Sequence, residues 1–213
     1  MMDPKQAFEE FDKHLMEDDA PSEYFNELLK QGIFDKGYPF TMLGKLAKTL
    51  QSVQHHPEGN VWNHTMLVVD KAAKHRKESG SPRIFMWAAL LHDLGKPDTT
   101  KVRKGKITSY DHDKLGEKLA AKFLTQLSSD KEFIHAVAKM VRWHMQLLFV
   151  VKDMPFADVE TMLEQVKLEE IALLSLCDRL GRGQMTADKE AHERESIQQF
   201  IYKSKGRSDN GKK

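Results

Sequence analysis

Apolar residues recur at intervals of three and four along most of this 213-residue chain. This spacing places apolar side chains on one face of a helix and is typical of amphipathic helices. In the first such stretch, Phe8, Phe11 and Leu15 follow the pattern. We therefore expect an all-α fold. The helices expected beyond residue 60 lie near 61–77, 83–94, 113–127, 131–145, 156–165, 168–180 and 188–203.

One segment departs from the helical spacing. Between residues 99 and 110, two short stretches rich in Thr, Val and Ile flank the turn Arg103-Lys104-Gly105-Lys106, which predicts a small β-hairpin with a basic tip. Such a tip is either a solvated turn or an element that steers an anionic substrate. We find no internal repeat or long linker, so residues 1–203 are expected to form one domain whose N-terminal helices occupy 5–50. The polar, basic residues 204–213 are expected to form a flexible tail.

The composition argues against several classes of protein, namely basic nucleic-acid-binding, membrane-spanning and secreted proteins. The 33 Lys and Arg nearly balance the 32 Asp and Glu, which argues against a generally basic surface for nucleic acid. No run of about 18 apolar residues is present to span a bilayer, and the first residues lack the pattern of a signal peptide. The single cysteine, Cys177, fits a reducing compartment. A cytoplasmic protein that does not enter membranes is the expectation.

His92 and Asp93 follow an apolar stretch, residues 84–91, that is expected to be buried almost all round. An imidazole and a carboxylate at the end of such a helix are costly unless a partner satisfies them. A divalent metal ion would do so, because neutral His and ionised Asp are common metal ligands. For an isolated His-Asp dipeptide, the alternative is a hydrogen-bonded pair at the helix end.

Three further positions favour the metal. His64 shares a helix with apolar Val61, Val68 and Ala72, while Asp178 and His144 each follow apolar residues at helical spacing. Separate helices would thus each direct one ligand inward, which is how helical bundles assemble metal sites in their cores. His112 begins the helix after the hairpin and could reach the same centre.

These residues carry a family resemblance. His64, the segment Leu91-His92-Asp93-Leu94-Gly95-Lys96 and Asp178 resemble the H…HD…D signature of the HD-domain metal-dependent phosphohydrolases. The segments 21–32, 56–65 and 177–183 are similar to the C-terminal HD region of bacterial multifunctional CCA-adding tRNA nucleotidyltransferases. The resemblance covers residues 5 to 185 and implies an HD-domain helical bundle with a metal-binding core over 56–185.

The resemblance also implies roles for individual residues. His64, His92, Asp93 and Asp178 would hold one divalent ion, with His112 and His144 available for a second ion. Mn, Fe, Ni, Co, Zn and Mg all remain candidates, because mixed His and Asp ligation suits several metals. Asp93 and Lys96 are the expected catalytic residues. Lys96, Arg142 and Arg182 are the expected contacts to substrate phosphate, the alternative being solvated or ion-paired side chains.

The implied activity is hydrolysis of nucleotide or RNA-end phosphate esters, as a 2′,3′-cyclic phosphodiesterase, nucleotidase or phosphatase. CCA addition is not carried over, because the matching residues include none of that family's nucleotidyltransferase part. An alternative is a hydrolase of nucleoside or dinucleoside polyphosphates, which the same ligands would serve. Another is a non-catalytic module that binds tRNA or nucleotides. The expected partner is a nucleotide or an RNA 3′ end, including tRNA; the oligomeric state and cooperation with a separate nucleotidyltransferase stay open.

Overall fold

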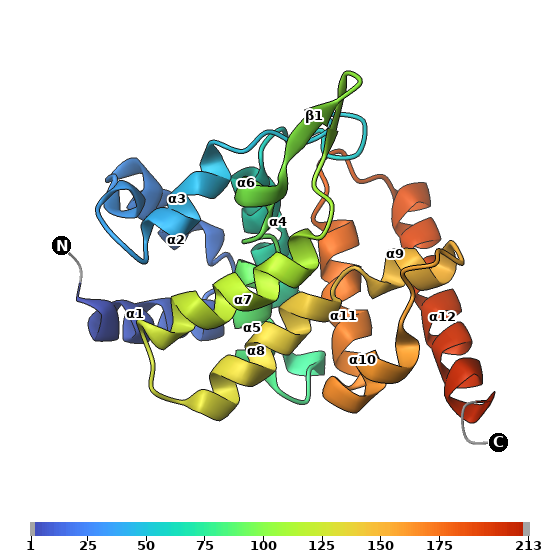
Figure 1. Ribbon diagram of the computed structural model, residues 1–213. Coiled ribbons are helices and arrows are strands. Elements are labelled where there is room, and N and C mark those ends of the chain that lie inside the picture. The colour runs from blue at the N-terminus through green and yellow to red at the C-terminus, as the bar shows by residue number, and fades with distance from the viewer. Residues whose placement is uncertain (1–2, 211–213) are drawn as a thin grey trace.

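The computed structural model describes residues 3–210, with side chains described as far as Gly206, and it is mostly helical with one small two-stranded hairpin. This confirms the all-α class and the single hairpin (Figure 1). The helices are α1 (Pro4–Glu17), α2 (Ser22–Lys30), η1 (Ile33–Asp35), α3 (Thr41–Ala47), α4 (Val61–His75), η2 (Arg76–Glu78), α5 (Pro82–Leu91), α6 (Lys96–Thr99), α7 (His112–Thr125), α8 (Lys131–Trp143), α9 (Gln146–Val151), α10 (Val159–Gln165), α11 (Leu168–Leu180) and α12 (Ala187–Asn210).

Helix α5 lies at the centre of the fold. Every side chain from Phe85 to Leu91 is buried, because α1, α4, α8 and α11 all pack against this helix (Figure 1). A helix that is apolar all round can exist in water only when neighbours cover each of its faces. The end of α5 therefore delivers the residues that follow it into the interior of the protein.

An aromatic cluster joins the N-terminal helices to this centre. The ring of Phe11 on α1 packs against Phe25, Phe34, Phe40 and Trp87, with ring centroids 5.1–6.4 Å apart. Edge-on and tilted aromatic pairs at such separations add to the stabilisation from buried area. This cluster fixes the N-terminal helices against α5.

Helix α8 packs against α5 and forms a closely packed pair with α7. The turn after α5 approaches the start of α7 so closely that a Cβ atom at Gly95 would lie only 2.8 Å from the backbone nitrogen of Gly116, and closer still to the carbonyl of His112. Only glycine fits such an approach. The glycine thereby brings the first turn of α7 next to Asp93.

The hairpin consists of the antiparallel strands β1 (Lys101–Arg103) and β2 (Lys106–Thr108). It projects from the helical body beside α6 (Figure 1). Lys101 pairs with Thr108, Val102 with Ile107 and Arg103 with Lys106. All six residues from Lys101 to Lys106 are exposed, so the hairpin contributes little to the core.

Several predicted boundaries need correction. Helix α5 ends at Leu91, so His92 and Asp93 lie in the turn beyond it rather than within the helix expected over 83–94. The short helices α6 and α9 were not predicted, because four to six residues carry too little periodicity. Helix α12 continues past residue 203 to Asn210, into the expected flexible tail, and residues 211–213 of that tail lie outside the described part. Within residues 3–210, no helix has both the length and the apolar character needed to cross a membrane.

Candidate metal centre

The structure gathers all six predicted metal ligands in one place. They come from the first turn of α4, the turn after α5, the start of α7, the end of α8 and the last turns of α11. Five of the six are buried, whereas the Asp178 side chain retains 14% exposure. The six residues, called here the His/Asp cluster, are His64, His92, Asp93, His112, His144 and Asp178.

Asp93 occupies the middle of the His/Asp cluster and divides its two carboxylate oxygens between two pairs of histidines. Its Oδ2 lies 3.3 Å from Nε2 of His92 and 3.8 Å from Nε2 of His64. Its Oδ1 lies 3.5 Å from Nε2 of His112 and 3.9 Å from Nε2 of His144. Each pair forms with Asp93 a trio whose ligand atoms all lie within 4.8 Å of one another. One carboxylate thus links two potential ion positions.

Backbone carbonyls fix the tautomer of three histidines. In each ring, Nδ1 lies within hydrogen-bonding distance of the carbonyl oxygen three residues earlier, and the three pairs are His92–Ala89 at 2.8 Å, His112–Ser109 at 2.7 Å and His144–Val141 at 2.6 Å. A carbonyl oxygen only accepts hydrogen bonds, so Nδ1 is the protonated nitrogen of each ring. In the neutral ring, Nε2 then presents a lone pair toward Asp93, as a metal-ligating imidazole requires.

The Nε2 lone pairs of His112 and His144 face each other. Their Nε2 atoms lie 3.1 Å apart, and burial lowers the pKa of both rings, that of His112 to about 4. Both rings are therefore neutral near pH 7, with two lone pairs facing each other unless a cation lies between them. Two nitrogens bound to one ion at about 2.1 Å are about 3 Å apart when they subtend a right angle. The donor set present here fits a divalent ion.

The two aspartates are held in the ionised form that a metal requires. Burial alone would raise the pKa of Asp93, but Lys96 and His92 outweigh it and hold that pKa well below its usual range. The pKa of Asp178 is lowered likewise, because its Oδ1 lies 3.0 Å from Nε2 of His64. Burial lowers the pKa of His64, yet the neighbouring carboxylates of Asp178 and Glu58 outweigh it and raise that pKa overall.

Lys96 lies at the edge of the His/Asp cluster. Its Nζ is 2.7 Å from Oδ2 of Asp93 and donates a hydrogen bond to Oε1 of Gln51, also at 2.7 Å. The side chain keeps 11% exposure. The structure thus places this predicted phosphate contact beside the cluster, held by an anion and an amide of the protein itself.

The two predicted arginines lie in different surroundings. Arg142 is bound to Asp113, with Nη1 2.7 Å from Oδ2, and its guanidinium lies over the Trp143 ring. Arg182 lies close enough to Asp178 to lower the pKa of that carboxyl, and its buried Nε has no hydrogen-bond partner among the described residues. Of the two, Arg182 is the arginine with a free donor near the cluster.

No role was predicted from the sequence for Glu58 or His56, which lie next to His64 in the structure. Oε1 of Glu58 lies 2.8 Å from Nδ1 of His56 and 3.0 Å from Nδ1 of His64, while Oε2 accepts a hydrogen bond from the backbone of Gly183 at 3.0 Å. Burial would raise the pKa of Glu58, but these partners lower it strongly. The only sign in the sequence was the polar loop His55-His56-Pro57-Glu58-Gly59 next to a ligand helix. A loop has no regular periodicity, so the direction of its side chains cannot be predicted from the sequence.

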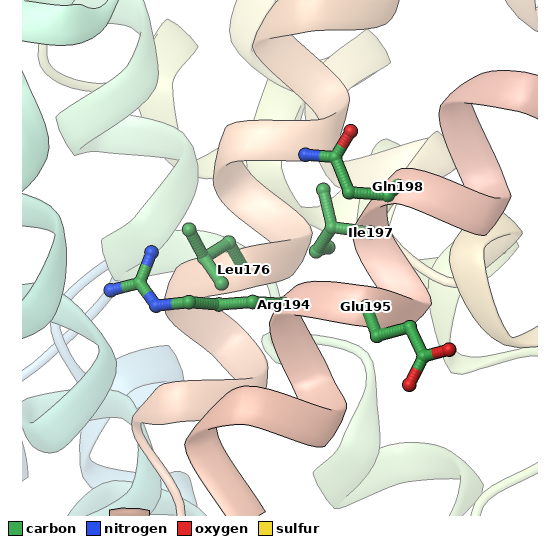
Figure 2. Close-up of a pocket in the computed structure, with 5 residues that line it drawn as sticks. All are labelled: Leu176, Arg194, Glu195, Ile197 and Gln198. Atoms are coloured by element: carbon green, nitrogen blue, oxygen red, sulfur yellow. The ribbon is translucent and has the colours of Figure 1, made fainter.

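Two hollows lie away from the cluster. A cavity of about 250 Å³ between α11 and α12 is lined by Leu176, Arg194, Glu195, Ile197 and Gln198 (Figure 2). A wider groove runs between α1, α7 and α8. Neither includes a residue of the His/Asp cluster.

A helical bundle whose core gathers four histidines and Asp178 around the carboxylate of Asp93 has the donor set of a His/Asp-type metal centre. Residues 61–183 match the model of the HD domain, which is more than half of the chain. The chain therefore belongs to the HD domain family. The family and the buried cluster together indicate a phosphohydrolase that uses a divalent metal ion.

The chain is also similar to multifunctional CCA proteins of several bacteria. It is 39% identical to that of Actinobacillus pleuropneumoniae serotype 5b over 83 residues, which are 39% of this chain and 20% of the relative. It is 29% identical to that of Azoarcus sp. strain BH72 over 189 residues, which are 84% of this chain and 43% of the relative. The chain thus spans less than half the length of these curated relatives. This distant homology confirms the resemblance to the HD region of such proteins.

Proposed function

We propose that this protein hydrolyses phosphate esters of nucleotides or RNA ends, as a 2′,3′-cyclic phosphodiesterase, nucleotidase or phosphatase. The observation that carries the proposal is the tautomer arrangement: three buried histidines donate from Nδ1 to backbone carbonyls and direct Nε2 toward one ionised aspartate. A bundle core gains nothing from such converging lone pairs unless a cation is bound there.

The ligand assignment follows from the two trios. His64, His92, Asp93 and Asp178 would hold one divalent ion, while His112 and His144 would share a second ion with Asp93. A bound divalent ion lowers the pKa of a coordinated water toward neutrality and stabilises the charge that develops on phosphoryl oxygens. The carboxylates of Asp93 and Asp178 stay ionised throughout the physiological range, so both are ready to ligate.

Cationic side chains near the cluster would bind the phosphate group of the substrate. Lys96 holds its ammonium 2.7 Å from Asp93, so a phosphate that approaches this carboxylate comes within reach of the same ammonium. Arg182 supplies a second donor on the side of Asp178. Arg142 is already neutralised by Asp113 and is the weaker candidate for a phosphate contact.

The identity of the ester rests on the relatives. The multifunctional CCA proteins have a domain similar to this chain, and the resemblance to CCA-adding tRNA nucleotidyltransferases favours an RNA 3′ end over a free polyphosphate. A nucleoside or dinucleoside polyphosphate hydrolase is the second candidate, because the same ligand set could serve that bond.

A substrate panel tests the proposal. Protein loaded with Mn²⁺, Ni²⁺ or Co²⁺ is offered nucleoside 3′-phosphates, 2′-phosphates, 2′,3′-cyclic phosphates, nucleoside triphosphates and diadenosine tetraphosphate. We expect turnover of the esters, lost in His92→Ala, while circular dichroism shows that this variant keeps its fold. Turnover of polyphosphates alone would favour the second candidate. Nucleotide binding without turnover of any compound would make the protein a binding module and contradict the proposal.

A further inference from the structure

The hairpin of residues 101–108 separates its charges by face. Cross-strand partners in an antiparallel pair point to the same side of the sheet, so the observed register places Lys101, Arg103 and Lys106 on one face. The opposite face carries Val102 and Ile107. We call the first of these the basic face.

The basic face has no internal counter-charge. No acidic residue occurs between Thr99 and Tyr110, and among the described residues none of the three cations forms an ion pair. The two flanking acids are already paired with lysines outside the strands, Asp98 with Lys45 at 3.3 Å and Asp111 with Lys114 at 2.8 Å. The charge of the basic face is therefore available to an anion from outside.

An aromatic ring accompanies these cations. The Arg103 guanidinium lies 5.2 Å from the centroid of the Tyr110 ring, and Tyr110 is 64% exposed. Cationic groups with an exposed aromatic ring beside them are the combination that binds single-stranded nucleic acid, since phosphates meet the cations and a base can stack on the ring.

One end of the hairpin follows Lys96, which contacts Asp93 of the cluster, and the other end leads into His112 of the cluster. Lys96 begins the helix that leads into β1, and on the far side the carbonyl of Ser109 accepts the hydrogen bond from Nδ1 of His112. A side-chain hydrogen bond of 2.7 Å between Thr100 and Ser109 closes the base of the hairpin. The hairpin therefore starts and ends next to the candidate metal centre.

The length of the hairpin determines which substrates could contact both the cluster and the basic face. Four residues from Thr100 to Lys104 at about 3.3 Å each place the tip about 13 Å beyond the base. A mononucleotide whose phosphate occupies the cluster lies at the base of the hairpin. Only a substrate with several successive phosphates spans the cluster and the basic face together.

From this placement we propose that the basic face of the hairpin binds the phosphate backbone of a single-stranded RNA end whose terminal phosphate ester lies in the His/Asp cluster. The inference deepens the proposed function. The position of the terminal phosphate ester in the His/Asp cluster rests on that function, whereas RNA binding by the hairpin does not. It assigns the substrate class as a polynucleotide end rather than a free nucleotide.

The test compares two variants with the same loss of charge. The first variant carries Lys101→Gln, Arg103→Gln and Lys106→Gln. The control carries Lys13→Gln, Lys74→Gln and Lys77→Gln, which are exposed positions on α1, at the end of α4 and on η2. Binding of a fluorescent 20-nucleotide RNA with a 3′-hydroxyl is measured by anisotropy on metal-loaded protein at several salt concentrations. This RNA has no terminal ester to cleave, so binding is read independently of catalysis.

We expect the hairpin variant to lose at least tenfold in affinity near 50 mM salt and the control to stay within twofold of the parent. Each phosphate contact to a single strand contributes about −0.7 to the slope of log K against log salt, so the loss of three contacts should make that slope shallower by about 2. With esters as substrates, kcat/KM should fall for an RNA 3′-phosphate and stay unchanged for a mononucleotide.

Equal RNA affinities in the two variants would overturn the proposal, and so would a loss of binding to anionic phosphatidylserine vesicles with RNA binding intact. If no ester is turned over yet the hairpin variant alone loses RNA, the proposed function fails while RNA binding by the hairpin stands. If both ester types are turned over equally by the hairpin variant, the proposed function stands and the hairpin inference fails.

Discussion

His112 and His144 come from different helices, yet their Nε2 atoms lie 3.1 Å apart while each Nδ1 binds the carbonyl three residues earlier. Neither ring can rotate its protonated nitrogen toward the other without losing that hydrogen bond. The pair is preorganised for a cation. In the metal-free protein, the repulsion of the two buried lone pairs lowers the stability of the fold. This relationship leads to the first two predictions.

Substitution of His144 should remove one ion and leave the other. We expect the parent to bind two equivalents of Mn²⁺ and His144→Ala to bind one, because His64, His92 and Asp178 do not depend on His144 for their position. Plasma mass spectrometry after dialysis measures the content. The control is His135→Ala, an exposed histidine on α8, the helix that His144 follows directly. A parent with a single equivalent that His144→Ala retains would contradict the second site.

The metal-free protein should lose stability as the pH falls from about 6.5 to about 4. Burial lowers the pKa of His112 to about 4, whereas the unfolded chain binds this proton near 6.5. The unfolded state thus carries more protons in that window, and the free energy of unfolding decreases with falling pH. The loss from this one group is at most about 3 kcal/mol.

Urea unfolding at several pH values in the presence of a chelator measures this dependence. His64 works in the opposite direction, since its pKa is raised and its contribution is lost as the pH rises. The comparison of parent with His112→Gln isolates the His112 part, which should flatten the curve between pH 4 and 6.5. An identical curve for both proteins would show that His112 is not held neutral.

Glu58→Gln should weaken metal binding without unfolding the protein. The carboxylate holds Nδ1 of His64 at 3.0 Å and so orients its Nε2 toward Asp93 and Asp178. Loss of a carboxylate behind a ligating histidine costs about 10- to 100-fold in metal affinity. Competition with a chromogenic chelator measures the affinity. Glu78→Gln is the matched control, because the exposed Glu78 contacts Nδ1 of His75 at 2.8 Å, away from the cluster, and its variant should bind metal like the parent.

Lys96→Ala should raise KM for phosphate esters about tenfold or more and leave the metal content unchanged. The ammonium is the cation nearest Asp93, and a hydrogen bond between charged groups contributes about 1.5–3 kcal/mol. Steady-state kinetics on a nucleoside 3′-phosphate measure the change. Lys45→Ala, which removes an exposed lysine paired with Asp98, should leave KM as it is. An unaltered KM in Lys96→Ala would remove this residue from the substrate site.

Gly95→Ala should push α7 away from the turn after α5. An added Cβ would lie 2.8 Å from the backbone nitrogen of Gly116, and backbone atoms cannot move aside as a flexible side chain can. Overpacking of this kind costs about 1–3 kcal/mol, and the shift should also weaken the ion held by His112. Thermal unfolding and metal content measure both effects. Gly206→Ala, with no atom within 4 Å of the added Cβ, should not destabilise the protein; a Gly95→Ala variant as stable as the parent would refute the close approach.

The sequence by itself determined the class of fold and the residue types of the site. Apolar spacing identified the longer helices and the faces on which His64, His144 and Asp178 lie, since a buried face imposes a period of 3.6 residues on the chain. Two short stretches rich in Thr, Val and Ile around a glycine-containing turn identified the hairpin near 99–110, because strand and turn preferences are also local. Polar groups on buried faces need partners, so several His and Asp residues on such faces together favoured a metal site over a hydrogen-bonded pair.

Only the tertiary structure decided how these groups meet. The division of the Asp93 oxygens between two histidine pairs depends on how α4 and α8 pack against α5 and how α7 packs against α8. The local spacing of apolar residues contains no information about distances between helices. Glu58 escaped prediction because loops have no periodic face. Arg142 stays a predicted phosphate contact, and only packing showed that Asp113 lies 2.7 Å from its guanidinium. Local patterns record which side of an element is buried, whereas the partner on that side is chosen by contacts between residues far apart in the sequence.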